Sequence, residues 1–143
     1  MVKILFVCHG NICRSPMAEF ILKHLVAQAG RSGDFEIASA ALSPEELHNP
    51  IYPPAVRELQ KHNIPFTPRR ARLVTDADFS RYHRIYYMDA RNARYLRSLG
   101  APMEKCRPLL SRDVADPYYS GDFTQTWEDI YTGCEQILEE FSC

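Results

Sequence analysis

Five residues separate a cysteine from an arginine near the start of the chain, in the segment Cys8-His9-Gly10-Asn11-Ile12-Cys13-Arg14-Ser15. A cysteine thiolate is a strong nucleophile, and the planar guanidinium of arginine can bind two oxygens of one phosphate group. Gly10 and Asn11 are residue types that readily adopt left-handed backbone angles, which turn successive N–H groups toward one point. The spacing therefore predicts a loop that closes around one tetrahedral anion, with Cys8 facing the phosphorus atom.

The segments on either side of this loop indicate how it is held. Residues 3–7 form a continuous apolar run, typical of a central parallel strand. After the loop, Ser15 is expected to cap a helix that has Pro16 in its first turn and stops near Gly30. The N–H groups and the dipole at the start of a helix favour an anion, and they favour the thiolate of Cys8 over its thiol for the same reason.

Strands and helices alternate along the rest of the chain. Strands are expected over residues 35–40, 84–88 and 105–110, helices over 54–62, 75–82, 90–99 and 122–141, and a proline-rich surface loop over 44–54. This order predicts an α/β fold, a three-layer sandwich with a central four-stranded parallel sheet and helices on both faces. We expect one domain over residues 1–143. Ligands of such sheets bind beyond the carboxyl ends of the strands, where the Cys8 loop would lie.

Composition excludes several classes of function. The chain has 143 residues, 45% hydrophobic and 24% charged, and its net charge of −1 is unlike that of a nucleic-acid-binding protein. No apolar run approaches the roughly 20 residues that cross a membrane. The five cysteines are odd in number and include no pair of Cys-x-x-Cys units, so neither a disulfide framework nor a zinc site is expected. We therefore expect a cytoplasmic protein without metal or cofactor.

The segment Val7-Cys8-His9-Gly10-Asn11-Ile12-Cys13-Arg14-Ser15-Pro16-Met17-Ala18-Glu19 resembles the signature of the low-molecular-weight protein-tyrosine phosphatases. The resemblance covers nearly the whole chain, because further motifs follow at that family's order and spacing: Ser39-Ala40-Ala41, Ala71-Arg72, Met88-Asp89 and Asp116-Pro117-Tyr118-Tyr119. It implies hydrolysis of phosphotyrosine and small aryl phosphates through a phosphocysteine on Cys8, with Arg14 binding the phosphate. It also implies phosphotyrosine proteins and a cognate tyrosine kinase as partners, no metal, and a monomer or weak dimer.

The resemblance also implies roles for other residues. Asp116 would protonate the leaving oxygen and then activate the attacking water. Ser15 would hydrogen-bond the Cys8 sulfur, and Asn11 and Ser39 would belong to a buried network that supports the loop. The remaining loop residues would bind phosphate through the backbone or shape the loop: His9, Gly10, Ile12 and Cys13.

Two features of the site follow from the same comparison. Tyr118 and Tyr119 would form an aromatic wall beside the pocket, together with the position occupied by Glu45. Cys13 matches a second loop cysteine of the family and could trap oxidised Cys8 as a disulfide, which would make the enzyme redox-sensitive. Whether the two tyrosines are themselves phosphorylated is left open.

Three positions depart from the family pattern. Family members often carry a histidine at the position of Arg69, where it joins the loop-supporting network, and an aromatic residue near the position of Glu45. His9 stands where smaller or apolar residues are commoner. The cluster around Arg69, with Arg70 and Arg72, is either a docking patch or a solvated surface with one structural ion pair.

Three alternative functions remain in view. An arsenate reductase of the same fold would need two further cysteines near the third strand, but residues 84–99 contain none. A protein-arginine phosphatase would carry threonine at the position of Ile12. A non-catalytic phosphate-binding module would be expected to lack the nucleophile or the acid, and both are present.

Overall fold

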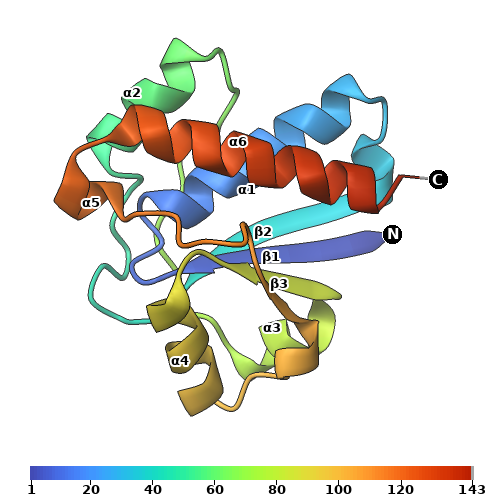
Figure 1. Ribbon diagram of the computed structural model, residues 1–143, viewed down its shortest axis with the longest axis vertical. Coiled ribbons are helices and arrows are strands. Elements are labelled where there is room, and N and C mark those ends of the chain that lie inside the picture. The colour runs from blue at the N-terminus through green and yellow to red at the C-terminus, as the bar shows by residue number, and fades with distance from the viewer. Residues whose placement is uncertain (143) are drawn as a thin grey trace.

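The sheet consists of four parallel strands in the order β2-β1-β3-β4. Figure 1 shows its place in the computed structural model, which describes residues 1–142. The strands are β1 (Val2–Cys8), β2 (Phe35–Ala41), β3 (Arg84–Tyr87) and β4 (Cys106–Pro108). β1 lies between β2 and β3, and every residue from Ile4 to Cys8 is buried. The apolar run at the start of the chain therefore forms a central strand covered on both faces, as predicted.

Residues 1–142 contain six α-helices and two short 3₁₀ turns. The helices are α1 (Arg14–Gln28), α2 (Pro53–Lys61), α3 (Asp76–Arg81), α4 (Ala90–Ser98), α5 (Pro117–Ser120) and α6 (Phe123–Glu140), and the 3₁₀ turns are Ser32–Asp34 and Met103–Lys105. In Figure 1, α1, α2 and α6 cover one face of the sheet, and α3 and α4 cover the other. This arrangement confirms the predicted three-layer α/β fold. None of the helices in this described part is long and apolar enough to span a membrane.

Two hydrophobic cores, one on each face of the sheet, follow from the alternation of side chains along β1. Ile4, Phe6 and Cys8 belong to the cluster that includes residues of α1 and α6. Leu5 and Val7 belong to the second cluster, with residues of α3 and α4. Because side chains alternate in a strand, Cys8 ends β1 on the α1 face, directly before the loop that leads into α1.

The start of the first helix differs from the prediction. α1 begins at Arg14, Cys13 is its N-cap, and no side chain caps it. The prediction that Ser15 caps the helix is therefore wrong. Ser15 lies inside the first turn, and its hydroxyl contacts the Cys8 sulfur instead of a helix N–H. The other predicted boundaries lie within two residues of those observed, but α5 was not predicted.

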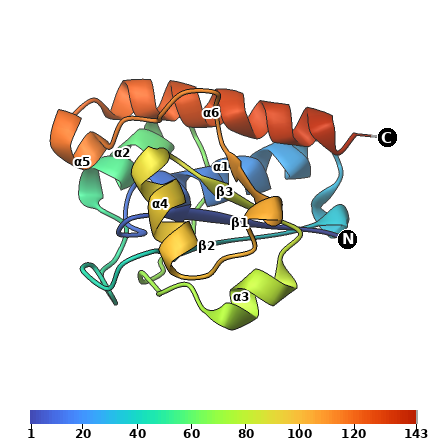
Figure 2. The same cartoon turned by 60° about the horizontal axis from the view of Figure 1, so that its bottom comes forward.

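Two residues predicted to act in catalysis, Cys8 and Asp116, lie at one end of the sheet together with Asp89. Cys8 is the last residue of β1, Asp89 follows β3 and is the N-cap of α4, and Asp116 is the N-cap of α5. Figures 1 and 2 show α5 and the start of α4 at the end of the sheet opposite the N-terminus. The topology therefore brings segments from the start, middle and end of the chain to one edge of the sheet.

Candidate active site

The loop after β1 is tied to the chain that follows β2. The N–H of Leu42 donates to the carbonyl oxygen of Cys8 (3.0 Å), and the N–H of Ser43 donates to that of His9 (3.1 Å). Asn11 has a φ of 59°, so one of the two predicted left-handed positions is confirmed. The expectation for Gly10 is wrong, because its φ is not positive. A side chain at Gly10 would place its Cβ 3.0 Å from Cγ of Glu46, so the glycine leaves room for that side chain.

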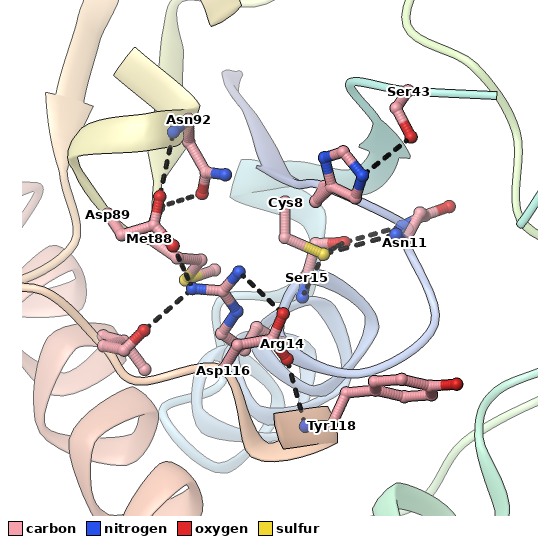
Figure 3. Close-up of polar contacts among 12 residues, drawn as sticks. Cys8, Asn11, Arg14, Ser15, Ser43, Met88, Asp89, Asn92, Asp116 and Tyr118 are labelled. Atoms are coloured by element: carbon pink, nitrogen blue, oxygen red, sulfur yellow. Dashed lines mark hydrogen bonds and ion pairs between the residues drawn. The ribbon is translucent and has the colours of Figure 1, made fainter. Parts of the chain in front are cut away.

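The Cys8 sulfur is surrounded by hydrogen-bond donors. It is 3.3 Å from the N–H of Asn11 and 3.4 Å from that of Ser15, and both groups donate to it. The Ser15 hydroxyl lies 3.0 Å from the same sulfur, as Figure 3 shows. Cys8 is only 3% exposed. Donors directed at one sulfur stabilise its negatively charged form relative to its neutral form, so the loop is arranged to hold a thiolate.

A hydrogen-bond network determines which way the Ser15 hydroxyl points. The side-chain oxygen of buried Asn11 accepts from the guanidinium of Arg69 and from the N–H of Arg72 (3.3 Å). The side-chain nitrogen of Asn11 therefore faces the other way, and it donates to the hydroxyls of Ser15 (2.7 Å) and Ser39 (3.0 Å). Since Ser15 accepts from Asn11, its own proton is free to point at the sulfur.

Glu19 and Arg69 also belong to this network, although the sequence alone predicts no contact for either of them. The Ser39 hydroxyl donates to Glu19 (2.6 Å), so its oxygen remains available to Asn11. Arg69 also donates to the backbone oxygen of Asn11 (2.8 Å) and so contacts this residue twice. The predicted ion pair of the neighbouring cluster is confirmed at Arg72, which contacts Asp78 at 2.9 Å. Arg69 thus supports the loop at the position where the family often has histidine.

Arg14 is held by a second set of partners. Its side chain is almost completely buried, and Nη1 donates to Asp89 (2.7 Å) and to the carbonyl oxygen of Val114 (2.8 Å). Nη2 contacts Asp116 at 3.5 Å. Figure 3 shows the guanidinium between the two carboxylates. Burial opposes its charge, but Cys8 and the two carboxylates outweigh this effect and raise the pKa of Arg14. Arg14 is therefore a fixed cation beside the sulfur.

Asp116 is placed by the short helix α5. One carboxylate oxygen accepts from the N–H of Tyr118 (3.1 Å), which is the hydrogen bond of an N-cap. Pro117 occupies the first turn, where its fixed φ suits a helix. The Asp116 side chain is 28% exposed, so it reaches both solvent and the cavity. A carboxylate in this position can exchange a proton with a bound substrate or with water.

A cavity of about 50 Å³ opens above the loop. Its lining combines the three predicted catalytic residues, four other residues of the loop, the predicted wall residues and Glu46. These are Cys8, His9, Gly10, Ile12, Cys13, Arg14, Glu45, Glu46, Asp116, Tyr118 and Tyr119. Asn11, Ser15 and Ser39 are buried outside this lining and support the loop. Residues 1–142 hold no cluster of three or more His, Cys, Asp or Glu side chains suited to a metal ion.

The wall of this cavity has an aromatic side and a charged side. Tyr118 stacks at an angle on Tyr52, with ring centroids 5.2 Å apart, and Tyr119 packs edge-on against Tyr118. The charged side of the wall is formed by His9 and Glu45, which contact each other at 2.8 Å. The departure from the family pattern at Glu45 is thus matched by the departure at His9, because the two residues pair with each other.

Cys13 is buried in the same loop. Burial, the nearby Cys8 and Asp116 raise the pKa of Cys13 well above the usual range for a thiol. The two cysteines of the loop therefore have different surroundings, since hydrogen-bond donors surround the sulfur of Cys8 and burial favours the protonated thiol of Cys13.

Comparisons with known proteins agree with this geometry. The sequence model described as "Low molecular weight phosphotyrosine protein phosphatase" matches residues 3–142. The low molecular weight protein-tyrosine-phosphatase YfkJ of Bacillus subtilis is 38% identical, over 96% of this chain and 94% of that protein. The low molecular weight phosphotyrosine protein phosphatase of Sus scrofa is 34% identical over 96% of this chain and 92% of its own.

Solved structures show the same relationship. The low molecular weight protein tyrosine phosphatase of Streptococcus pyogenes superposes with a TM-score of 0.94 at 33% identity, covering 100% of this chain and 95% of that one. The crystal structure of YfkJ gives a TM-score of 0.93 over 98% of this chain and 94% of its own. The chain belongs to the low molecular weight phosphotyrosine protein phosphatase family.

Proposed function

We propose that this protein hydrolyses phosphotyrosine in proteins, and small aryl phosphates, through a phosphocysteine on Cys8. The observation that carries the proposal is the Cys8 sulfur itself, surrounded by three hydrogen-bond donors in a cavity that Arg14 and Asp116 also line. A nucleophile, a phosphate-binding cation and a proton donor are the groups that this two-step reaction needs.

In the first step the Cys8 thiolate attacks the phosphorus atom. A sulfur–phosphorus bond forms as the bond to the tyrosyl oxygen breaks, and Asp116 gives its proton to that oxygen. The backbone N–H groups of the loop and the Arg14 guanidinium stabilise the charge on the phosphoryl oxygens. Asp89 and the Val114 carbonyl fix the guanidinium before substrate arrives, so little reorganisation is needed.

In the second step water attacks the phosphocysteine. Asp116 accepts a proton from the water, a phosphorus–oxygen bond forms, and the sulfur–phosphorus bond breaks to release Cys8 as a thiolate. The Ser15 hydroxyl stabilises the departing sulfur, because the Asn11 amide already directs its proton there. The tyrosines of the wall would hold an aryl ring deep enough for phosphorus to reach Cys8.

Cys13 supports a further part of the proposal, reversible redox sensitivity. Hydrogen peroxide would convert the Cys8 thiolate to a sulfenic acid, and the Cys13 thiol would then condense with it, releasing water and forming a disulfide. Peptide mapping by mass spectrometry after peroxide treatment tests this. We expect a disulfide between the two loop cysteines, and recovery of activity with a thiol reductant. A sulfinic acid on Cys8 without any disulfide would contradict it.

The cellular setting is proposed on chemical grounds. A catalytic thiolate requires reduced Cys8, which favours the cytoplasm over an oxidising compartment. The partners that fit this activity are phosphotyrosine proteins and a cognate tyrosine kinase, and a monomer or weak dimer is sufficient for a site whose proposed groups all come from one chain.

The function is tested by comparing substrates and variants. The reduced protein is assayed for release of phosphate from phosphotyrosine and phosphoarginine peptides, and for arsenate-dependent oxidation of a thiol. We expect phosphotyrosine to be the preferred substrate, no activity in Cys8→Ser, and wild-type activity in Cys106→Ser, a cysteine outside the site. Faster turnover of phosphoarginine, arsenate reduction, or activity in Cys8→Ser would overturn the proposal.

A further inference from the structure

A second, larger cavity of about 420 Å³ adjoins the catalytic one. Five residues line both cavities: His9, Arg14, Glu45, Asp116 and Tyr119. The far side of the larger cavity is formed by α4, through Arg91, Arg94, Tyr95 and Ser98. His9 connects the two sides, because its ring packs edge-on against Tyr95 with centroids 6.2 Å apart. A substrate bound at Cys8 would therefore extend over α4.

The exposed face of α4 is strongly basic. Arg91, Arg94, Tyr95 and Ser98 are spaced three and four apart, so they lie on one face of the helix, and all four are exposed; buried Asn92 also lines the cavity. The face that includes Ala93 and Leu96 is buried. The nine residues of α4 include three arginines and no acidic residue, although the whole chain has a net charge of −1. Two of these arginines, Arg91 and Arg94, line the cavity.

The acidic residues that line the cavity already have partners. Glu45 hydrogen-bonds the His9 ring at 2.8 Å, and Asp89 and Asp116 both contact the Arg14 guanidinium.

Unlike these acidic residues, Arg91 and Arg94 of α4 have no such partner among the described residues. Neither Arg91 nor Arg94 makes a hydrogen bond or an ion pair with any side chain among residues 1–142, although the charge of Arg91 helps to hold the pKa of Asp89 down. The guanidinium groups without a partner therefore face a cavity wide enough for a side chain, next to the catalytic site. Arginine is well suited to bind carboxylates there, since its planar fork matches their two oxygens.

We propose that Arg91 and Arg94 bind an acidic side chain that flanks the phosphotyrosine of the substrate protein. The proposal rests on the proposed phosphatase function and adds the class of sequence that the enzyme prefers. The expected occupant is an aspartate or glutamate of the substrate, because the cavity is continuous with the one where the phosphotyrosine would bind. Neither arginine has a hydrogen-bonded or ion-paired partner among the described residues, so a substrate carboxylate can take that place.

The experiment compares two peptides that differ only in the residues flanking phosphotyrosine, glutamate in one and alanine in the other. The quantity measured is the ratio of their kcat/KM values. We expect the wild type to favour the glutamate peptide about three- to tenfold, as two partly exposed ion pairs would give. In Arg91→Ala/Arg94→Ala the ratio should approach one, and added salt should lower the wild-type ratio by screening.

Two further variants sharpen the test. Arg57→Ala removes an exposed arginine of α2 that lines neither cavity and should keep the wild-type ratio. Arg91→Glu/Arg94→Glu should favour a lysine-flanked peptide over the glutamate one. The proposal would be overturned if the wild type had the same kcat/KM for the glutamate and alanine peptides. It would also be overturned if both double variants kept the wild-type ratio of these kcat/KM values.

A binding measurement separates this proposal from the proposed function. The Cys8→Ser protein is titrated with the same two peptides, each fluorescently labelled, and anisotropy gives the two Kd values. Tighter binding of the glutamate peptide supports the subsite even if catalysis fails. If the wild type hydrolyses both peptides equally well and Cys8→Ser binds them equally, the phosphatase function stands and the subsite does not.

Discussion

Replacement of Arg69 by alanine tests whether the hydrogen-bond network behind the loop is needed for catalysis. Arg69 makes two hydrogen bonds to Asn11, one to the backbone oxygen and one to the side-chain oxygen. Asn11 is fully buried and has a left-handed backbone, so it depends on its partners to keep this conformation. Without Arg69, the Asn11 amide can turn, and the Ser15 proton is no longer directed at Cys8.

The size of the effect follows from these contacts. A hydrogen bond to a charged group contributes about 1.5–3 kcal/mol, but half-buried Arg69 can be replaced in part by water, so we expect a loss of about 2 kcal/mol in stability. For catalysis, loss of one positioned donor should lower kcat roughly tenfold to hundredfold. KM should change little, because Arg14 and the loop N–H groups still bind phosphate.

Steady-state kinetics with an aryl phosphate and urea denaturation measure both effects. Arg70→Ala is the matched control, since Arg70 is exposed and its side chain donates a hydrogen bond to the carbonyl oxygen of His48, outside the network. Arg69→His should recover part of kcat, because one ring N–H can still donate to the Asn11 amide. A kcat for Arg69→Ala within a factor of two of wild type, or an equal loss in Arg70→Ala, would refute the reasoning.

Three further predictions concern charge, packing and proton transfer. Asp89→Asn should destabilise the fold by about 2 kcal/mol in urea at pH 7, because it removes a charge paired with buried Arg14. Burial raises the pKa of Asp89, but Arg14 outweighs this effect and holds it low, so the contribution present above about pH 4 should vanish on acidification. Gly133→Ala would place a Cβ 2.5 Å from Leu109 and should cost about 1–3 kcal/mol by thermal denaturation. Asp116→Asn should lower kcat about 10²–10⁴-fold for phosphotyrosine, and less for aryl phosphates with acidic leaving groups.

Each of these predictions has a control and a result that contradicts it. Asp34→Asn alters an exposed carboxylate and should leave stability nearly unchanged, so an equal loss there would undermine the Asp89 argument. Gly33→Ala meets nothing within 4 Å and should be neutral, whereas an unaffected Gly133→Ala would show that Leu109 moves aside freely. An Asp116→Asn enzyme with wild-type kcat toward phosphotyrosine would remove Asp116 from the mechanism.

The fold could be predicted because its signals are local in sequence. The buried strand β1 appears as a continuous apolar run, and the long helix α6 appears as apolar residues at helical spacing. The four-residue helix α5 gives no such signal, since it is too short for a periodic pattern. Its start at Asp116-Pro117 does fit an N-cap followed by proline, which could have indicated it.

The residue types and spacing of the loop predict its chemistry, whereas the distant residues of the site, such as Asp116, were predicted only from the family resemblance. The loop from Cys8 to Ser15 is one segment, and its spacing indicates its chemistry. The contacts of Arg14 with Asp89 and of Asn11 with Arg69 join residues 75 and 58 positions apart. The family resemblance singles out the positions of Asp89 and Arg69, but nothing local indicates which residues they contact, so only the tertiary fold reveals these pairs.

Ser15 shows how a local rule can fail beside a functional group. Serine near a helix start is a common N-cap, and the prediction followed that preference. In the structure its hydroxyl lies between the Asn11 amide and the Cys8 sulfur, so these contacts replace the cap. A helix without a capping side chain, at the point where an anion would bind, is consistent with a helix N-terminus reserved for a ligand.

The central claim is that phosphate is transferred to Cys8 during turnover. Asp116→Ala should slow hydrolysis of the intermediate, so rapid mixing with an aryl phosphate followed by acid quenching should trap it. Mass spectrometry of the resulting peptides then locates the added phosphoryl group. We predict a phosphoryl group on Cys8, absent when Cys8→Ser is combined with Asp116→Ala. Phosphate release by a reduced, active enzyme with no phosphoryl group on Cys8 at any mixing time would contradict the account.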